Sequence, residues 1–549
     1  MGFELTNFQD PQLDAAYLEH LVDRRAEDAA ASYGRLWDYF RNPLVSATAA
    51  TAGVMNGNAR PYFQAQEIGL PARITGLQRV AGATRSSDLT RKEVVIENDI
   101  AWRIHTMVDF LFGRPVTITS LASEPSLAEA VEQALAAMLQ ANGSISLLQE
   151  MALLGSVYGF VDIALRTPAD GMAVPPPASL LPAPLPAAAA STAAARRPGT
   201  PDSNRRDGAG SPEPSWSKPN TAHAVAAART MRLETVEAWR VLPILAEDDY
   251  RTTRYWVQKF HKHPARMSAA QRGWLRAAWT SRASDPAVVE VIEIISPTWW
   301  QRYEDRKLIA EGPNHLGRLP VVHVQNLALP ASYGGLSDVE PLMPLQDELN
   351  TRLSDRAHRV TYQSFKMYLG KGIDDFLERP VGPGQMWATQ NLDAGIEEFG
   401  SDTGSPSEDA HIEQCRQALD KVSGVTPLAA GLIRGNVGNL TSATALKVLL
   451  SGLLAKTARK RLTYSTGLKQ IAALALEWLD LTGALRTRPE DRRVEIHWPD
   501  PLPIDEAEQL RNAQIKAQLG VPAERVLAEI GYAGLTPDVK ADKQEDGKE

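Results

Sequence analysis

The sequence predicts an α+β subunit that is mainly helical and built from several compact units. Apolar residues recur at helical spacing over 90–158 and 338–530, whereas 233–326 holds short segments rich in Val, Ile, Tyr and Trp, which favour strands. Of the 549 residues, 44% are hydrophobic and 23% are charged, which provides for several hydrophobic cores. The longest uncharged stretch, 172–195, contains six prolines, so we expect no membrane-spanning helix.

Helices and one strand are predicted ahead of residue 168. Thr90 with Glu93, and Ser126 with Glu129, form two capping boxes, in which side chains satisfy the free backbone N–H groups of a helix start. We therefore expect helices over 94–112, 130–140 and 144–157, followed by a strand over 160–165.

Residues 168–232 form a low-complexity segment rich in Pro, Ala, Ser and Gly. Such a segment has too little apolar surface to offset its ordering entropy, so we expect a disordered insertion. The strand-like residues on its two sides are compatible with a single domain from which the insertion loops out.

After the insertion, the pattern first favours strands and then long helices. Four strand segments are expected at 253–262, 287–296, 298–310 and 319–326. Leucines at helical spacing predict a helix over Asp338–Leu369, which is followed by a short mixed segment and a returning helix over Asp409–Ser423. A long helix over 441–481, a strand over 493–500 and two short helices, Asp505–Leu519 and Pro522–Ile530, complete the chain.

Charge is distributed unevenly in a chain whose net charge is −8. Residues 421–476 contain no Asp or Glu but eight basic residues: Lys421, Arg434, Lys447, Lys456, Arg459, Lys460, Arg461 and Lys469. Either the helical part of this segment pairs with acidic neighbours such as Glu340, Asp347 or Asp355, or it presents a surface to a polyanion such as DNA. Charge alone does not decide between these two readings.

Three arginines, Arg352, Arg356 and Arg359, lie along one face of the 338–369 helix. Glu348 with Arg352, and Asp355 with Arg359, have the i,i+4 spacing of helical ion pairs. A salt-bridged, solvated face is therefore at least as good an explanation as DNA contact.

No enzymatic motif is present. The sequence lacks a Walker A loop, a nucleophile elbow, a zinc-protease helix and a dinucleotide fingerprint. The lone Cys415 excludes a disulfide framework within the chain, and we expect no metal and no cofactor. The glycine-bearing loop 431–440 lacks the spacing and the lysine of a nucleotide-binding loop, so we interpret it as a connection between helices.

Several blocks in fixed order resemble the portal proteins of tailed bacteriophages. The most similar blocks are LPVVHVQN, SDVEPLMPLQDELNTRLSDRAHRVTYQSFKMYLGKG and GNLTSATALKVLLSGLLAKTARKRLTY, with RKEVVIENDIAWRIHTMVDFLFGRPVTI upstream and HWPDPLPIDEAEQ downstream. Together they span about 90–530. The Pro/Ala-rich insertion departs from the family pattern and leaves the wing boundary open there.

The resemblance implies a division of the chain into named parts. It implies a wing (1–335), a stem helix (336–369), a clip (370–405), a returning stem helix (406–431), a tunnel loop (432–440), a long, kinked tunnel helix (441–482), a further wing strand (483–503) and a crown (504–549).

The resemblance also implies a function: a ring of about twelve copies at one capsid vertex, through which double-stranded DNA is packaged and ejected without sequence readout. The implied partners are the terminase, head-completion or tail adaptors, scaffold and major capsid protein; the implied locations are the virion and, during assembly, the host cytoplasm.

The candidate channel-loop residues are Arg434, Gly435, Asn436, Val437, Gly438 and Asn439. A basic field of Lys447, Lys456, Arg459, Lys460 and Arg461 is expected near the DNA, with Arg352, Arg356 and Arg359 in the stem. Two alternatives stay open: another structural or adaptor protein of the virion, or an enzyme with an unrecognised active site.

Overall fold

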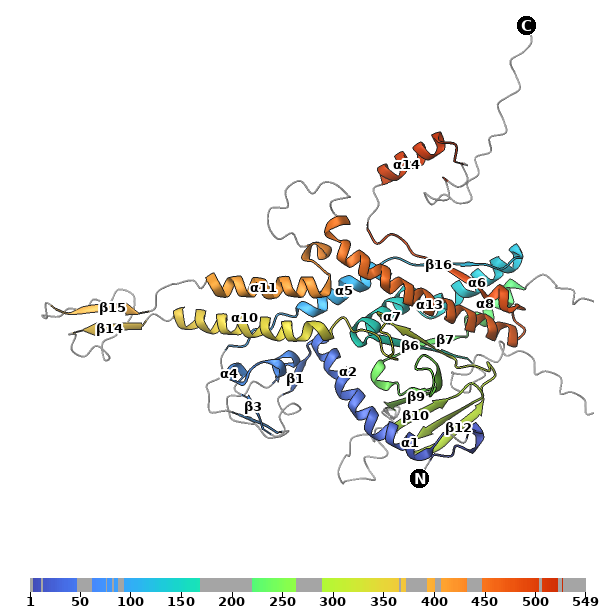
Figure 1. Ribbon diagram of the computed structural model, residues 1–549, viewed down its shortest axis with the longest axis horizontal. Coiled ribbons are helices and arrows are strands. Elements are labelled where there is room, and N and C mark those ends of the chain that lie inside the picture. The colour runs from blue at the N-terminus through green and yellow to red at the C-terminus, as the bar shows by residue number, and fades with distance from the viewer. Residues whose placement is uncertain are drawn as a thin grey trace, which may run out of the picture. The chain divides into compact units, whose positions relative to one another are not determined.

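The computed structural model describes most of the chain, in two units that comprise Met1–His497 and Trp498–Glu549 (Figure 1). The described residues are 3–10, 13–46, 62–75, 77–80, 83–86, 93–167, 220–262, 289–364, 367–371, 393–399, 406–431, 447–502, 506–521 and 526. Among the described helices, none is long and apolar enough to cross a bilayer. The mixed, mainly helical α+β class predicted from the sequence is confirmed.

The N-terminal segment is an interrupted helix followed by small elements. The helical part consists of η1 (Thr6–Phe8), α1 (Ala15–His20), the π-helical turn η2 (Leu21–Arg25) and α2 (Ala26–Arg41). After it come β1 (Leu44–Ser46), β2 (Tyr62–Gln64), η3 (Ala65–Gly69), α4 (Ala72–Thr75), β3 (Leu77–Val80) and β4 (Ala83–Ser86). Strands β1 and β2 pair with each other, as do β3 and β4.

Three helices follow, close to the predicted positions: α5 (Asp99–Phe112), α6 (Pro125–Ala141) and α7 (Ile145–Tyr158). The predicted start of the first helix is wrong, because 93–98 is not helical and the Asn98 side chain caps α5 instead. The second predicted capping box does not form either, since α6 begins with Pro125 and has no side-chain cap. Proline suits this position, where its missing N–H would have no partner.

A three-stranded sheet in the order β13-β6-β7 joins the two sides of the insertion. Strand β6 (Phe160–Arg166) is buried along its whole length and pairs antiparallel with β7 (Arg232–Val236) and with β13 (Val321–Gln325). Both sides of the insertion therefore belong to one domain.

The predicted extent of the insertion is wrong at its C-terminal end. Residues 221–228 form helix α8 (Thr221–Ala228), which packs on α6 and fully buries Ala224 and Ala228. Small alanine side chains allow this close packing despite the low-complexity composition. Residues 168–219 lie outside the described part of the chain.

A five-stranded antiparallel sheet in the order β12-β11-β10-β9-β8 follows. Its strands are β8 (Ile244–Leu245), β9 (Thr253–Lys262), β10 (Val289–Ile295), β11 (Trp299–Glu304) and β12 (Lys307–Pro313), with the short turn η6 (Ala238–Arg240) ahead of them. The segment expected as one strand over 298–310 is a hairpin, whose turn places Asp305 and Arg306 at positive φ. The N-terminal helical segment covers one face of this sheet and forms an apolar core with it.

Two antiparallel helices extend from this body and carry a hairpin at their far end (Figure 1). They are α10 (Met343–Ser364), which follows the turn η7 (Glu340–Leu342), and α11 (Pro406–Ser423); the hairpin is formed by β14 (Met367–Lys371) and β15 (Gly395–Phe399). The predicted helix over Asp338–Leu369 is thus too long, because its last residues pair as a strand. Most of the predicted clip, 370–405, lies outside the described residues.

A long helix, α13 (Ser451–Leu481), runs along the body after the turn η8 (Pro427–Ala430). The predicted start at 441 falls on residues that are not described, and 447–449 are helical. The turn η9 (Pro489–Arg492) leads to β16 (Val494–His497), which pairs with β5 (Thr117–Ser120) and confirms the predicted strand. In the second unit, α14 (Glu506–Gln518) agrees with the predicted helix over 505–519, whereas most of 522–530 is not described.

Candidate functional site: the junction of the long helix and the helix pair

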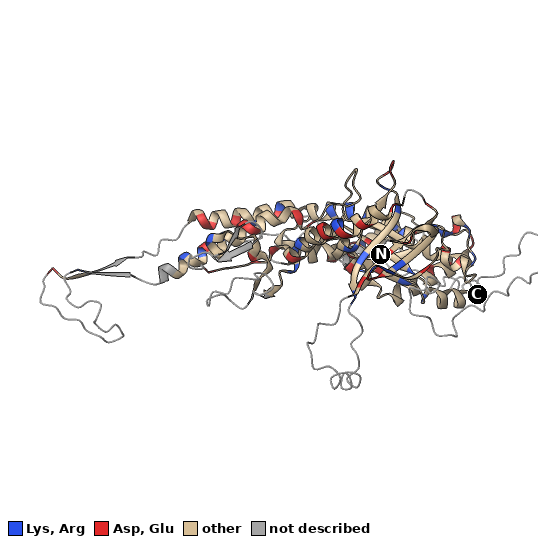
Figure 2. Ribbon diagram, turned by 90° about the horizontal axis from the view of Figure 1, so that it is seen from below, with Lys and Arg blue, Asp and Glu red and all other residues tan. Residues whose placement is uncertain are grey.

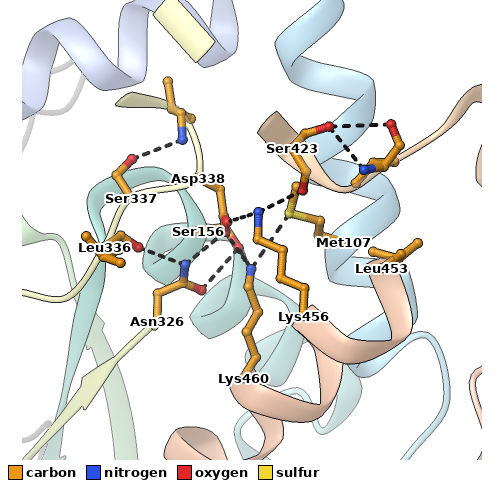
Figure 3. Close-up of polar contacts among 12 residues, drawn as sticks. Met107, Ser156, Asn326, Leu336, Ser337, Asp338, Ser423, Leu453, Lys456 and Lys460 are labelled. Carbon is orange, nitrogen blue, oxygen red and sulfur yellow. Dashed lines mark hydrogen bonds and ion pairs between the residues drawn. The ribbon is translucent and has the colours of Figure 1, made fainter. Parts of the chain in front are cut away.

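Two lysines of α13 meet a single carboxylate where the helix pair α10–α11 joins the body (Figure 3). Lys456 and Lys460 are one helical turn apart and therefore lie on the same face of α13. Their ammonium groups lie 2.7 Å from Oδ1 and 2.5 Å from Oδ2 of Asp338, respectively. We call Asp338, Lys456 and Lys460 the ion cluster.

The ion cluster is enclosed by the protein. Asp338 is 1% exposed and Lys460 is 2% exposed, whereas Lys456, nearer the edge, is 12% exposed. Because a charge without a partner is costly to bury, such groups need compensating charges and hydrogen bonds.

Neutral partners from three other helices, together with Asn326, complete the cluster. The Lys460 ammonium donates to Ser156 Oγ of α7 at 2.8 Å and approaches Met107 Sδ of α5. Asn326, directly after β13, donates from Nδ2 to Asp338 Oδ2 at 2.8 Å. Lys456 donates to the carbonyl oxygen of Ser423, the last residue of α11, and so satisfies a carbonyl left free at a helix end. The cluster thus connects α13 to the roots of both α10 and α11.

Burial and charge act in opposite directions on the groups of the cluster. Burial by itself would raise the pKa of Asp338, but the ammonium groups of Lys460 and Lys456 hold that pKa well below its usual range. For Lys460, burial lowers the pKa, Lys456 lowers it further, and Asp338 opposes both. Burial and the Asp338 charge raise the pKa of the neighbouring Tyr464 hydroxyl.

A polar seam docks α10 onto the segment ahead of α5. The residues of α10 that are fully buried there are Gln346, Asn350 and Ser354. Their side-chain oxygens accept hydrogen bonds, at 3.0 Å each, from the backbone N–H groups of Asp99, Glu97 and Val95. These contacts fix both the register and the direction of α10 relative to the body.

The second helix of the pair is held to α5 by charge. The Arg103 guanidinium, 1% exposed, lies 2.5 Å from Asp420 of α11 and 3.2 Å from Asp99. It also lies over the Trp102 ring at 4.3 Å. Further along α11, Arg416 pairs with Glu97 at 2.7 Å. The root of the helix pair is therefore anchored on both of its helices.

The three stem arginines are all paired with acidic residues of the same helix pair. Arg352 lies 2.7 Å from Glu348, as predicted. Arg356 lies 3.0 Å from Asp409, and Arg359 pairs with Glu408 of α11 and not with Asp355 as expected. Figure 2 shows basic and acidic residues along both helices. The salt-bridged face is thus the reading that the structure favours over free cations.

The basic field divides into two groups. Lys447, just ahead of α13, and Arg459, on α13, are exposed, whereas Arg461 is half-buried. The expectation that Lys456 and Lys460 belong to a surface facing DNA is corrected, because both ammonium groups point into the protein and pair with Asp338. The candidate channel-loop residues, 434–439, lie outside the described part of the chain.

Asp338, Ser156 and Asn326 were not among the predicted site residues. A signal for Asp338 was present, since two lysines at i,i+4 repel each other unless a shared anion lies between them. The sequence offered several nearby acids, and only the three-dimensional arrangement selects Asp338 among them.

Comparisons with known proteins give a family match that covers more than half of the chain. A family model described as phage portal protein, SPP1 Gp6-like, matches residues 226–532. A solved structure of the virion of a native gene transfer agent particle contains a similar chain, with 13% identity, a TM-score of 0.38 and coverage of 78% of this chain and 88% of that one. No curated protein matches.

Proposed function

This chain belongs to the SPP1 Gp6-like family of phage portal proteins, which are structural components of the virion and not enzymes, and from that membership we propose that it forms a ring of about twelve copies around a channel for double-stranded DNA. The ring occupies one capsid vertex, and DNA passes through it during packaging and ejection.

The partners follow from the same proposal. The hairpin end of the helix pair, with residues 370–405, is the docking region for the terminase during packaging and for head-completion or tail adaptors afterwards. Scaffold and major capsid protein contact the ring during assembly in the host cytoplasm. Contacts with DNA are made to phosphates and carry no sequence preference.

The observation that carries the channel proposal furthest is the course of α13 relative to α11. The ion cluster ties α13 to the end of α11, and residues 432–446 connect the two helices. Both ends of this connection are thereby anchored, which suits a loop that contacts moving DNA. The exposed Lys447 supplies positive charge directly after this connection in the sequence, and Arg459 is exposed further along, on α13.

We further propose that the ion cluster is a mechanical joint between the channel loop and the helix pair. A displacement of α11 is passed to α13 through the bond from Lys456 to the Ser423 carbonyl, at 2.9 Å. The pair of Asp338 and Lys460 keeps the root of α10 fixed to the same helix.

The first test is the mass and symmetry of the purified protein, by native mass spectrometry and negative-stain microscopy. Twelve copies of a 59.9 kDa chain give a ring of roughly 0.7 MDa with a central hole. A protein that stays monomeric or dimeric, even when co-expressed with its scaffold, contradicts the ring.

The channel and the joint are tested by packaging assays on variants that still form rings. Shortening 435–439 is expected to block packaging while leaving ring yield unchanged; normal numbers of full heads contradict the channel role.

Lys456→Met keeps the buried pair of Asp338 and Lys460 but removes the bond to Ser423, so packaging is expected to fall with ring yield intact. Lys469→Met, at an exposed lysine of the same helix, is the matched control. Equal packaging by both variants contradicts the joint.

A further inference from the structure

A stripe of exposed residues runs along the first half of α13. Its five members recur at intervals of three and four residues, which places them on one face of the helix. They are Gly452, Ala455, Arg459, Leu462 and Thr466. We call them the basic stripe, because Arg459 is its charged member and residues 421–476 contain no Asp or Glu.

A second exposed stripe, on α6, has the same spacing and the opposite charge. Its members are Ser126, Glu129, Gln133, Ala136 and Gln140. We call them the acidic stripe, because residues 115–165 contain no Lys, Arg or His, and Glu124 is exposed at the start of the helix. Both stripes follow the pattern i, i+3, i+7, i+10, i+14, so they are equally long, at about 21 Å.

The charged groups of the two stripes are not neutralised by the described part of their own chain. Among the described residues, Arg459 has no ion-pair partner. Glu129 accepts a hydrogen bond from Gln133 Nε2 at 3.0 Å, and Glu124 accepts one from the Ser126 hydroxyl at 2.5 Å; both donors are neutral and belong to α6. Each stripe thus carries charge that a second molecule can neutralise.

Exposed apolar side chains accompany both stripes. Leu462, in the basic stripe, is 71% exposed, and Leu329, which is 36% exposed, lines the same open cavity of about 490 Å³ as Leu462. Leu121, just ahead of α6, is 56% exposed. Covering these side chains would remove apolar surface from water, which favours association. The cavity beside Leu462 also leaves room for a side chain of a partner.

The composition of the basic stripe favours a protein helix over DNA as its partner. Double-stranded DNA carries one charge per about 1.7 Å of its axis, so roughly twelve charges would run alongside a stripe of this length. One arginine among Gly452, Ala455 and the exposed Leu462 does not match that density. A helix face with few charges and small side chains does, and the acidic stripe is such a face.

The two stripes also match in register. Spacing by three and four residues is typical of helices that pack side by side at a shallow angle. When the stripes overlap fully, their central members, Arg459 and Gln133, lie opposite each other whether the helices run parallel or antiparallel. Glu129 is then one helical turn from the position opposite Arg459, within reach of its long side chain.

We propose that the basic stripe of one copy packs against the acidic stripe of the next copy around the ring. This inference rests on the proposed portal ring and names surfaces that join its subunits. Within one copy both stripes are exposed, so they do not cover each other. A contact between two different surfaces of the same chain leaves one of each free at the ends, and copies therefore add until the ring closes.

The test is a charge exchange in the full chain, read by native mass spectrometry of a dilution series. The quantity measured is the protein concentration at which half of the chain is in rings. Arg459→Glu and Glu129→Arg each place like charges at every contact around the ring, so this concentration is expected to rise at least about tenfold. Combined in one chain, the two substitutions restore opposite charges, and the concentration is expected to return to within about threefold of the wild-type value.

Arg459→Glu combined with Glu247→Arg is the matched control, since Glu247 is an exposed acid just after β8 and its reversal gives the same net charge as the exchanged pair. This control is expected not to restore rings, which separates pairing of the stripes from an effect of net charge. Recovery by a second substitution does not arise from misfolding, so the reading does not depend on the stability of either single variant.

A wild-type protein that forms no ring contradicts the portal ring itself, and the contact with it. Where wild-type rings form, three results overturn the contact alone: rings of Arg459→Glu at the wild-type concentration, no recovery in the exchanged pair, or equal recovery in the control. If Arg459→Glu forms normal rings that bind less DNA, the basic stripe faces DNA instead of a second copy.

Discussion

Asp338 has two cations within contact distance, and the three side chains must balance one another away from water. Removing the carboxylate charge leaves two buried ammonium groups whose remaining partners are neutral. Breaking a buried pair in this way generally costs about 3–5 kcal/mol, because the surviving charge is left uncompensated. The stability of the junction is thus concentrated in one residue.

We therefore expect Asp338→Asn to lower the free energy of unfolding by about 3–5 kcal/mol, as measured by urea titration at pH 7. Asp355→Asn is the matched control, since Asp355 lies at 20% exposure and pairs with Arg73 and Arg352. That substitution is expected to cost less than about 1 kcal/mol. Equal effects of the two substitutions would show that the ion cluster adds nothing to an ordinary surface pair.

The same residue gives a pH dependence with a definite sign. The pKa of Asp338 is depressed in the folded chain, so its contribution is fully present above the unfolded value of about 3.9 and is lost as pH falls toward the folded value. The difference in stability between wild type and Asp338→Asn is expected to be constant above pH 5 and to shrink by about 1.4 kcal/mol per pH unit below pH 4. Urea titrations at pH 7, 5, 4 and 3 measure it; a difference that grows on acidification is the contrary result.

At the scale of elements, α10 is notable for the chemistry of its buried face. Leucines at helical spacing predicted an apolar stripe, yet three of the fully buried side chains in the middle of the helix are polar: Gln346, Asn350 and Ser354. Of the stripe, Leu349 is fully buried, while Leu345 and Leu353 are only half-buried and Val360 is 50% exposed. Within one chain, α10 is positioned by hydrogen bonds from the backbone of residues 95–99, just ahead of and at the start of α5. Its apolar stripe is left largely uncovered.

The long helix α13 contains two glycines with different surroundings. Gly467 lies against β13, and a Cβ there would come within 2.4 Å of a methyl group of Val324. Gly452 has room, since the first atom that a Cβ would meet is the Gly424 carbonyl oxygen at 3.5 Å. Gly467 thus serves close packing, whereas a Cβ at Gly452 would make only ordinary contacts.

Alanine substitutions in α13 are therefore expected to act in opposite directions. Gly467→Ala overpacks the contact with β13 and lowers the free energy of unfolding by about 1–3 kcal/mol. Gly452→Ala is expected to raise it by up to about 1 kcal/mol, because alanine favours the helix. Thermal unfolding of the two variants side by side decides the matter, and destabilisation by both would show that Gly452 is also under a packing constraint.

At the scale of the whole molecule, the Pro/Ala-rich insertion is bounded by structure on both sides. Strands β6 and β7 pair directly, with Arg166 opposite Arg232, so the sheet continues across the insertion. Helix α8, which ends just ahead of β7, buries Ala224 and Ala228 against α6. The segment that could be removed without loss of packing is consequently shorter than the low-complexity segment 168–232, because it ends before α8.

Replacing 170–219 by a short Gly/Ser linker is expected to leave both stability and ring assembly unchanged. Replacing 170–230 instead removes α8 and is expected to lower the unfolding midpoint, because the buried surface of α6 becomes exposed. Native mass spectrometry and thermal unfolding of the two deletions make the comparison. Loss of rings in the shorter deletion would assign the insertion a structural role.

The sequence by itself determined the class of the fold, the order of its elements and the family. Local patterns were sufficient for β9, β13, α7 and α11, because turn residues and the spacing of apolar residues act over a few neighbours. Patterns failed at helix ends, as at 93–98 and 367–369, where hydrogen bonds to distant residues compete with helix formation.

Only the tertiary structure decided which charges meet. Lys456 and Lys460 carried the same weight as Lys447 and Arg459 in the sequence, since each adds one positive charge to an acid-free segment. Folding brings Asp338 to two of them across more than a hundred residues and leaves the other two at the surface. Partners of buried charges depend on the long-range path of the chain, which neither composition nor local periodicity encodes.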